Sequence, residues 1–446
     1  MINLSTPPSV QIPEHAGLKQ FFCKFGQTNG LFYMGHASVL AVFGGKKILF
    51  DPVILSKPYS DSWAFFPAQV ADLSVFEVDA VVVSHIHQDH YDLEYLKALD
   101  GKAKIVVVGG RPSFVEDLQQ NGVKNLLIVK PETVTEILDG VNMFGVTHES
   151  NGIDSSAIVY NEAFCVYHGN DNYLQPHSLQ KFTCVGPTID VACIPYAYIH
   201  WYPFLLEYGD GLADEKQAEG DRLVNMYMDD CLNAVRILQP KLMIPFGANL
   251  LLDDGDAYSD INLAVKTPIE FVEYAAHKSP DFANSVYPML AGDYCGLTGH
   301  KDISITIAQH FDSDSYRARA HSFLRGRPVK QNDTNWKPID KLAFIANLND
   351  KVRRITERLD NIIRVEMNYL DEKLCVEIDC QQHSARWVDE FSGDKNYHHF
   401  KLDSIAAGCW LNGGRFEEVI GMRRFTLRRE PNIYSKDILR LISTAI

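Results

Sequence analysis

A dense group of ligand-type side chains follows one short apolar run of the sequence. The stretch VVVSHIHQDHYD, residues 81–92, places His85, His87, Asp89 and His90 within six positions. If the valine run is a strand, His85 and His87 lie on one face of it, because alternate residues of a strand share a face. Asp89 and His90 then lie on the loop that follows. Imidazole and carboxylate groups are ligands of zinc, iron and manganese, so the stretch predicts a metal site.

Packing alone does not account for this group. A single histidine in an apolar strand is more often a core residue whose ring nitrogens are satisfied. Four such side chains together would each need a buried partner, because an unpaired buried polar group costs about 1–3 kcal/mol. We therefore expect the group to bind a cation.

The surrounding sequence alternates between strand-like and helical patterns. Residues 31–55 read as two strands around Gly44-Gly45, which is a hairpin signal. Apolar runs predict further strands at 79–84, 104–110, 125–130 and 241–247, and helical spacing covers 215–239. This pattern is typical of two mixed sheets covered by helices, an α/β sandwich.

The character of the sequence changes near residue 300. We predict a metal-binding domain over residues 1–300 and a smaller α+β accessory region over residues 301–446. In the second region, residues 348–367 (LNDKVRRITERLDNIIRVEM) carry Leu and Ile at helical spacing and predict a helix.

Arginines gather near the end of the chain, at Arg423, Arg424, Arg428 and Arg429. Paired arginines suit recognition of phosphate or carboxylate groups. In an acidic protein they are more often surface ion-pair partners.

Composition narrows the class of partner. The 446 residues carry a formal net charge of -15, which disfavours binding to the phosphate backbone of nucleic acids. Nine cysteines without a CxxC pair indicate a reducing compartment. The first residues do not read as a signal peptide, and no apolar run approaches the roughly 18 residues of a membrane span. We expect a cytoplasmic protein that acts on a small molecule, with neither nucleic acid nor membrane as a partner.

The stretch SHIHQDH matches the HxHxDH signature of the metallo-β-lactamase superfamily, and other landmarks resemble that family in the same order. The resemblance implies a metallo-β-lactamase αββα sandwich, of class α/β. The implied ligands are, for a first metal, His85, His87 and His148; for a second metal, Asp89 and His90; and between the two, Asp171.

The same resemblance implies the chemistry of the site. The cofactor would be zinc, as one or two ions, with iron or manganese as alternatives. Such metals lower the pKa of a coordinated water toward about 7. Asp89 would orient that water as a catalytic residue, and Asp51 would hold a ligand or loop in place from behind.

A closer resemblance concerns the metallo-β-lactamase-like part of CMP-N-acetylneuraminate hydroxylases and their bacterial relatives. Residues 48–67 (ILFDPVILSKPYSDSWAFFP) are similar to its DPW…SW…P stretch, and residues 424–442 (RFTLRREPNIYSKDILRLI) are similar to its C-terminal end. Those hydroxylases also carry a Rieske iron–sulfur region. This sequence has no CxH…CxxH pattern, so we expect no Rieske centre in it.

The family usually supplies one late histidine to the second metal, and the matching residues 241–271 contain none. Asn249 and Asn262 are the nearest polar substitutes, and His200 is an earlier candidate. His36 and Trp63 remain open between a place in the cleft and a structural role.

Two functions follow from these residues. The first is a metal-dependent hydrolase of a small-molecule ester, lactone, amide or phosphodiester that uses a metal-bound hydroxide. The alternative is an iron-dependent oxygenase or its subunit, which would need an electron-transfer partner. Flavodiiron members of the superfamily carry a carboxylate at the position of His87, so a histidine there favours hydrolysis. A homo-oligomer is compatible with either function.

Overall fold

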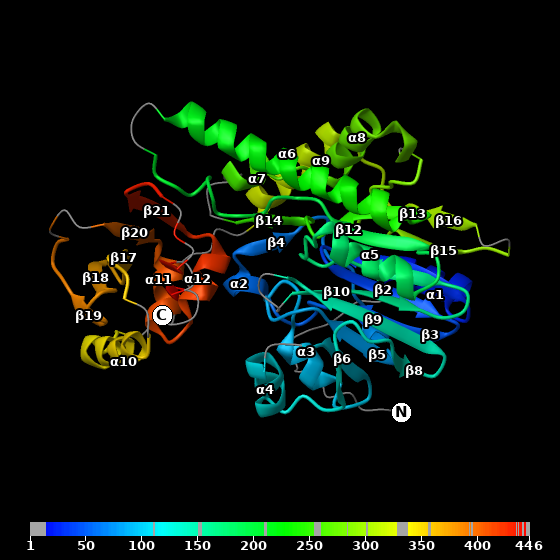
Figure 1. The fold of residues 1–446 in the computed structure, drawn as a ribbon, viewed down its shortest axis with the longest axis horizontal. Helices are drawn as coiled ribbons and strands as arrows, with labels where there is room; N and C mark the ends of the chain where they lie inside the picture. The colour runs from blue at the N-terminus through cyan, green and yellow to red at the C-terminus, as the bar shows by residue number, and fades with distance from the viewer. Residues whose placement is uncertain are drawn as a thin grey trace.

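Two facing β-sheets form the centre of the larger part of the molecule (Figure 1). The computed structural model describes residues 15–442, apart from short segments at 110–111, 150–153, 209–211, 254–259, 283, 300–301, 328–337, 356–357, 392, 394–395, 434, 436 and 439–440. In spatial order the first sheet holds eight strands: β16 (Ile303–Thr306), β15 (Tyr294–Leu297), β1 (Asn29–Gly35), β2 (Ser38–Phe43), β3 (Lys46–Phe50), β5 (Ala80–Val83), β6 (Lys104–Val108) and β7 (Leu126–Val129). The second holds six: β13 (Leu242–Phe246), β12 (Val191–Pro195), β11 (Cys165–His168), β10 (Ser155–Tyr160), β9 (Val141–Thr147) and β8 (Thr135–Leu138).

Hydrophobic clusters divide this part into four layers. One cluster fills the space between the sheets and includes Phe50 and Val106 from the first sheet and Val166 and Ile244 from the second. The outer face of the first sheet is covered by α1 (Ala16–Phe25), α3 (Leu93–Ala98) and α4 (Pro112–Gln120). The outer face of the second is covered by α5 (Pro176–Val185), α6 (Ala213–Leu238) and α8 (Pro268–Lys278). The predicted αββα sandwich is therefore confirmed.

The predicted hairpin is also present. β2 and β3 pair in antiparallel fashion around Gly44 and Gly45, whose φ angles are 57° and 89°. Left-handed backbone of this kind favours glycine, because a Cβ atom would meet the backbone. From β3 onward the pairing becomes parallel through β5, β6 and β7, which brings the carboxyl ends of β3 and β5 side by side.

A third, five-stranded sheet lies in the C-terminal part of the chain. Its strands are, in spatial order, β19 (Ser384–Trp387), β18 (Glu372–Asp379), β17 (Ile362–Tyr369), β20 (Tyr397–Leu402) and β21 (Phe425–Glu430). Its helices are α10 (Lys341–Arg353), α11 (Ser404–Leu411) and α12 (Phe416–Met422). One hydrophobic cluster runs from Val224 on α6 to Ile363 on β17, so the two parts of the molecule share apolar packing.

The helix predicted over residues 348–367 is wrong in its second half. α10 ends at Arg353, and Ile362 begins the central strand of the third sheet. The isoleucines fit helical spacing, but burial between two neighbouring strands decides their conformation. The domain boundary at residues 300 and 301 stays a prediction. It falls between β15 and β16, which pair with each other in the first sheet.

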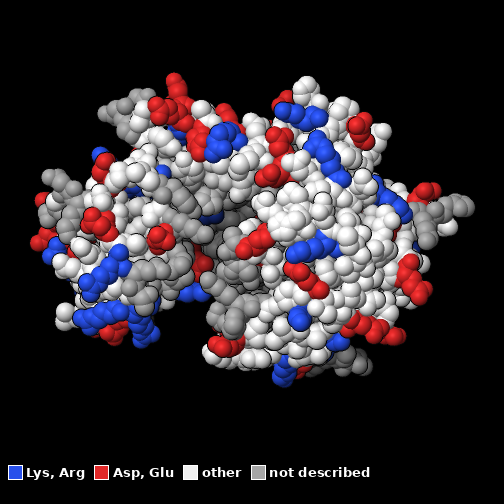
Figure 2. Space-filling model, viewed as in Figure 1, with Lys and Arg blue, Asp and Glu red and all other residues white. Residues whose placement is uncertain are grey.

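Smaller elements connect these layers. They are α2 (Pro58–Asp61), β4 (Trp63–Phe65), η1 (Leu73–Phe76), β14 (Leu250–Leu252), α7 (Asp260–Ala264), η2 (Pro280–Phe282) and α9 (Ser313–Gly326). β4 and β14 form a two-stranded antiparallel sheet near α2 (Figure 1). Among the described residues, no helix has both the length and the apolar character needed to cross a membrane. Acidic and basic side chains are interspersed over the face in Figure 2.

Candidate metal centre

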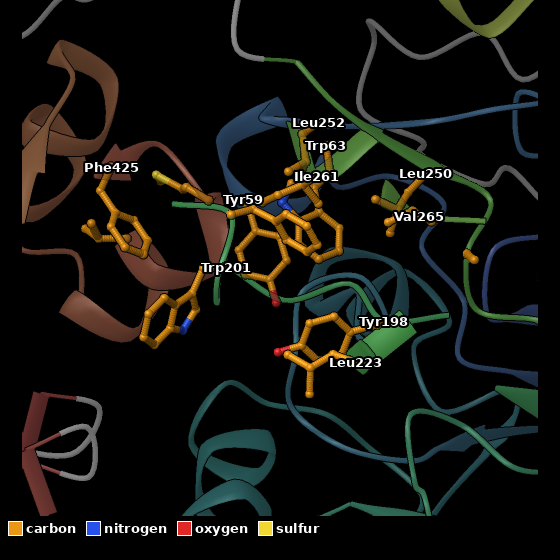
Figure 3. Packing of buried hydrophobic residues seen from close by; sticks show 14 of the residues in the cluster. Tyr59, Trp63, Tyr198, Trp201, Leu223, Leu250, Leu252, Ile261, Val265 and Phe425 are labelled. Atoms are coloured by element: carbon orange, nitrogen blue, oxygen red, sulfur yellow. The ribbon is translucent and has the colours of Figure 1, made fainter. Parts of the chain in front are cut away.

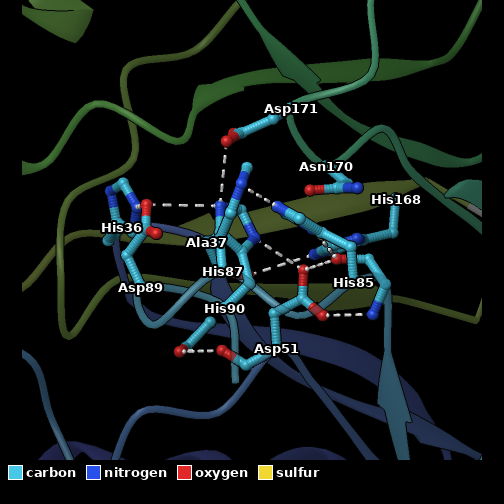
Figure 4. A network of polar contacts seen from close by, with 12 residues as sticks. His36, Ala37, Asp51, His85, His87, Asp89, His90, His168, Asn170 and Asp171 are labelled. Carbon is cyan, nitrogen blue, oxygen red and sulfur yellow. Dashed lines mark hydrogen bonds and ion pairs between the residues drawn. The ribbon is translucent and has the colours of Figure 1, made fainter. Parts of the chain in front are cut away.

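The ends of β3 and β5 create the support for the predicted metal group. Asp51 follows β3, and its N–H donates to the carbonyl of Val82 at 3.0 Å. Its carboxylate accepts from the N–H of Ser84 at 2.8 Å and from the Ser84 hydroxyl at 2.6 Å. The same carboxylate lies 2.9 Å from Nδ1 of His90 (Figure 4). Asp51 therefore sets the orientation of the His90 ring, the contact expected of a residue that supports a metal ligand.

The charge state of Asp51 follows from these contacts. Burial favours the neutral carboxyl group, but the bond to His90 and the charges of His90 and His168 outweigh it and hold the pKa of Asp51 below its usual value. An ionised Asp51 accepts a proton-bearing Nδ1, which leaves Nε2 of His90 directed away from it. In the described structure that buried Nε2 makes no well-aligned hydrogen bond.

His85 and His87 meet at the first of two places where ligand atoms converge. Nε2 of His85 lies 2.6 Å from Nδ1 of His87, and Oδ1 of Asp154 lies 3.9 Å from the same Nε2. Ligand atoms of these three residues all lie within 4.8 Å of one another. Burial and the charges of His87 and His90 lower the pKa of His85 to about 4. His85 is thus neutral at pH 7, the form in which imidazole binds metals.

Carboxylates converge on His90 at the second place. Nε2 of His90 lies 3.2 Å from Oδ2 of Asp171 and 3.5 Å from Oδ2 of Asp89. Burial lowers the pKa of His90, but the two carboxylates outweigh this and raise it well above the usual value. Desolvation raises the pKa of Asp171, and the charge of His90 outweighs it and lowers this pKa to about 2. A cation between these groups would replace the proton on His90, since metal binding releases protons from its ligands.

Asp89 is held from two further sides. His36 Nε2 lies 3.1 Å from Oδ2 of Asp89, and the Tyr59 hydroxyl donates to Oδ1 at 3.1 Å. Burial raises the pKa of Asp89, whereas His90 and His36 lower it well below its usual value. His36, which the sequence left open, thus faces the cleft and contacts a predicted ligand.

The side chains share donor types that fit a divalent cation. His85, His90 and Asp171 form a third group within 4.8 Å, and it joins the His85–His87 group to the group of His36, Asp89 and His90. Imidazole and carboxylate donors suit zinc, iron and manganese alike. The buried Nε2 of His90, backed by Asp51, matches the carboxylate–histidine arrangement found behind metals. Five of the six residues predicted as ligands are brought together in this way.

The sixth, His148, has a different place. It follows β9, and its N–H donates to the carbonyl of Asp154 at 2.8 Å. Its imidazole belongs to none of the three convergent groups of the described residues. Asp154, one residue before β10, instead supplies the third side chain beside His85 and His87. No motif spacing marked Asp154 in the sequence, and ligation by His148 stays a prediction.

The cluster opens into a pocket of about 420 Å³. Trp63 and His200, both candidates from the sequence, line this pocket. Its aromatic walls include Tyr59, whose ring centroid lies 4.7 Å from that of Trp63, and Tyr198 and Trp201 lie near them in Figure 3. Burial, with the nearby charge of Arg423, lowers the pKa of His200 to about 3, so this imidazole is neutral.

The two asparagine candidates do not reach the pocket lining. The Asn262 amide donates to the carbonyl of Leu252 and accepts from its N–H, both at 2.8 Å. The Asn249 side chain accepts from the Tyr33 hydroxyl at 2.6 Å. Both amides thus serve internal structure, so neither replaces the late histidine at the described cluster.

Comparisons with known proteins agree with this geometry. A family model described as a beta-lactamase superfamily domain matches residues 30–246. A protein of Mycolicibacterium smegmatis, named for a Rieske 2Fe-2S iron-sulfur protein, is 26% identical over 59% of this chain and 53% of its own length. A metal-dependent hydrolase of Saccharolobus solfataricus is 28% identical over 32% of this chain and 62% of its own.

The resemblance to the hydroxylase group is also found. The inactive cytidine monophosphate-N-acetylneuraminic acid hydroxylase of Homo sapiens is 29% identical over 22% of this chain and 21% of its own length. This chain therefore spans only part of each curated relative. Among solved structures, a metallo hydrolase of the archaeon Ignicoccus hospitalis is 18% identical, with a TM-score of 0.41, over 63% of this chain and 99% of its own. The motif, the two-sheet sandwich and the family match agree: residues 30–246 form a beta-lactamase superfamily domain with the metallo-β-lactamase fold.

Proposed function

We propose that the protein is a metal-dependent hydrolase of a small-molecule ester, lactone, amide or phosphodiester. The observation that carries the proposal is the chain of three convergent groups, in which His85 and His90 each belong to two groups. Such an arrangement suits one or two cations beside a pocket large enough for a small molecule. Zinc is the first choice of metal, because the histidine-rich donor set suits it.

Each residue has a separate task in this proposal. His85, His87 and Asp154 would hold one cation, and His90 with Asp171 would hold or share a second. The bound metal would polarise the scissile bond and lower the pKa of a coordinated water. Asp89 is ionised and lines the pocket, so it can accept a proton from that water. Its hydrogen bonds from Tyr59 and His36 fix its orientation.

An iron-dependent oxygenase is the alternative, and the curated relatives support it. One relative carries a Rieske name, and another, from Pongo pygmaeus, is a hydroxylase by name. Carboxylates from Asp89, Asp154 and Asp171 around the histidines would also suit iron. This function would require electrons from a separate partner protein.

Metal analysis tests the two proposals against each other. Protein purified without chelator is expected to contain zinc near one or two equivalents and to hydrolyse members of a panel of chromogenic esters, lactones and phosphodiesters. Replacement of His87 by Ala should remove metal and activity together. Iron with a visible absorption band, and no hydrolysis across the panel, would favour the oxygenase instead. Full activity of His87→Ala would contradict the assigned site.

A further inference from the structure

The C-terminal region supplies part of the wall of the metal-site pocket. Arg415, Gly421 and Arg423, from α12 and its two ends, line it together with the metal-group residues. Figure 2 shows the molecule hollowed between the C-terminal region and the two-sheet part. α12 also approaches α2 closely, since a Cβ atom added at Gly421 would lie 2.2 Å from Cε1 of Tyr59. The pocket is therefore completed by residues outside the matched family domain.

Arg423 is one of two arginines in this wall, and the other, Arg415, lies near the carboxylates of Glu417 and Glu418. Arg423 follows α12 in the left-handed conformation, with φ of 59°, and its guanidinium carbon lies 6.0 Å from the Trp63 ring. Nη1 donates to the carbonyl of Ile420 at 2.6 Å, and Nη2 donates to the carbonyl of Ile199 at 3.4 Å. Its Nε is buried and has no hydrogen-bond partner among the described residues.

Neighbouring arginines show what is unusual about Arg423. Arg424 pairs with the carboxylate of Asp403, with Nε and Oδ2 2.5 Å apart. The Arg429 guanidinium bonds to the side chain of Asn432 at 2.8 Å. Arg428 points to solvent from an exposed position of β21. Only Arg423 of these four lines the metal-site pocket, and in the described structure no carboxylate lies within ion-pair distance of it.

The surroundings of Arg423 make an unpaired guanidinium costly. Burial lowers its pKa, while Tyr59, Asp89, Tyr198 and Asp171 act in the opposite direction. Asp89 and Asp171 belong to the metal groups, and a bound metal would neutralise their negative charge. A desolvated cation then needs an anion from elsewhere, because an uncompensated buried charge is strongly unfavourable. The protein has a net charge of -15, so its overall field repels anions. Binding of an anion in this pocket would therefore depend on the local charge of Arg423.

We infer that Arg423 binds an anionic group of the substrate, a carboxylate or a phosphate, beside the metal site. The guanidinium fork is the side chain best suited to such groups, since it donates hydrogen bonds to two oxygens at once. Trp63 and Tyr198 provide apolar walls that strengthen the contact by excluding water. The inference rests on the proposed function and narrows its substrate to anionic small molecules.

Anion binding can be measured without a known substrate. We would titrate glutarate, as a carboxylate probe, and inorganic phosphate into the wild type, Arg423→Gln and Arg428→Gln by isothermal titration calorimetry. Arg423→Gln should weaken binding of at least one probe by about tenfold or more, the usual loss for a charge-assisted hydrogen bond. Arg428→Gln, five residues along the same segment and exposed, should bind as the wild type does. The probe that shows the loss identifies a carboxylate or a phosphate as the preferred group.

A chelator-treated sample separates this inference from the proposed function. Loss of binding in Arg423→Gln relative to the wild type, measured in the metal-loaded protein, supports the anion site even if no hydrolysis is found, and this difference should shrink after metal removal, because Asp89 and Asp171 then keep their negative charge near Arg423. Equal affinity of the wild type and Arg423→Gln, or no binding of either probe to the wild type, would overturn it. Binding of a probe that requires the metal but does not require Arg423 would also overturn the inference. If Arg423→Gln fails to fold, Arg423→Lys keeps the charge and loses the planar fork, and undiminished affinity for both probes in that variant would equally count against the inference.

Discussion

The hydroxyl of Tyr59 donates a hydrogen bond of 3.1 Å to Asp89, the carboxylate expected to orient the attacking water. The ring of Tyr59 lies against Gly421 of α12, from the C-terminal region. Tyr59 therefore links α12, in the C-terminal region, to Asp89 of the metal groups. Its backbone adopts the left-handed conformation, with φ of 52°, which the surrounding packing must hold in place.

Tyr59→Phe should lower catalytic efficiency while leaving metal content unchanged. The variant keeps the ring that packs on α12 and removes the hydroxyl, so Asp89 loses one of its two fixing contacts. A lost hydrogen bond to a charged group is worth about 1.5–3 kcal/mol, or roughly 10- to 150-fold in kcat/KM if it acts in the transition state. The measurements are kcat/KM and metal content per chain. Tyr91→Phe, which removes a hydroxyl bonded to Asp117 away from the cluster, is the matched control and should retain activity.

Gly421→Ala should destabilise the protein and reduce activity. An added methyl would lie 2.2 Å from the Tyr59 ring, so α12 or the ring must shift. Such overpacking typically costs about 1–3 kcal/mol, which exceeds the gain in helix propensity of alanine over glycine. Urea denaturation gives the change in the free energy of unfolding. Gly326→Ala at the end of α9, where no atom lies within 4 Å of the added carbon, should be neutral or stabilising. Equal stability of the two variants would show that α12 does not press on Tyr59.

Asp154→Asn should weaken metal binding. Asp154 is the third side chain of the His85–His87 group, and an amide is a weaker ligand than a carboxylate. Loss of one such group is expected to lower metal affinity by about 10- to 100-fold. Competition with a chromogenic chelator measures this affinity. His148→Gln belongs in the same titration, because unchanged affinity in Asp154→Asn together with a loss in His148→Gln would assign the third ligand to His148.

Acid should destabilise the C-terminal region through His398. Burial, together with the charge of Arg429, lowers the pKa of this buried histidine to about 4, and its Nδ1 bonds to Asn361 at 3.1 Å. The unfolded chain, with an ordinary histidine pKa near 6.5, binds a proton that the folded chain does not bind between pH 6.5 and about 4. This contribution to stability is therefore complete above pH 6.5 and declines as pH falls to about 4. Its size is on the order of 3 kcal/mol.

Denaturation curves at several pH values test this dependence. His398→Gln should remove part of the slope of unfolding free energy against pH in this range. An identical slope in His398→Gln and the wild type would mean that His398 is not the group that titrates.

Local spacing in the sequence was sufficient for much of the site. β5 ends at Val83, so His85, His87, Asp89 and His90 all lie in the short segment after the strand and not on one face of it, and their proximity needs only the local backbone. Asp51 comes directly after the neighbouring strand, β3. It lies beside this segment because β3 and β5 are parallel, which brings their carboxyl ends together. The two-sheet fold could likewise be predicted from the sequence, because the alternation of strands and helices does not depend on the details of the loops.

Other features depended on contacts that no local pattern encodes. Residues 348–367 carry apolar spacing that suits a helix, yet β17 forms there because β18 and β20 flank it. Asn262 has the chemistry of a substitute ligand, but its amide bonds to the backbone of β14. Arg424 pairs with Asp403, whereas Arg423, next to it in the sequence, turns into the pocket.

The sequence by itself determined the kind of chemistry: it supplied a cluster of imidazoles and carboxylates in an order and spacing that identify a metal-binding sandwich. Only the tertiary structure decided which distant residues join that cluster. Asp154 joins the metal groups, and Tyr59 and Arg423 line the pocket beside them, each from a separate segment. Their positions arise from the packing of α12 on α2 and of one sheet on the other, and such long-range packing depends on the whole hydrophobic core, which no short stretch of sequence specifies.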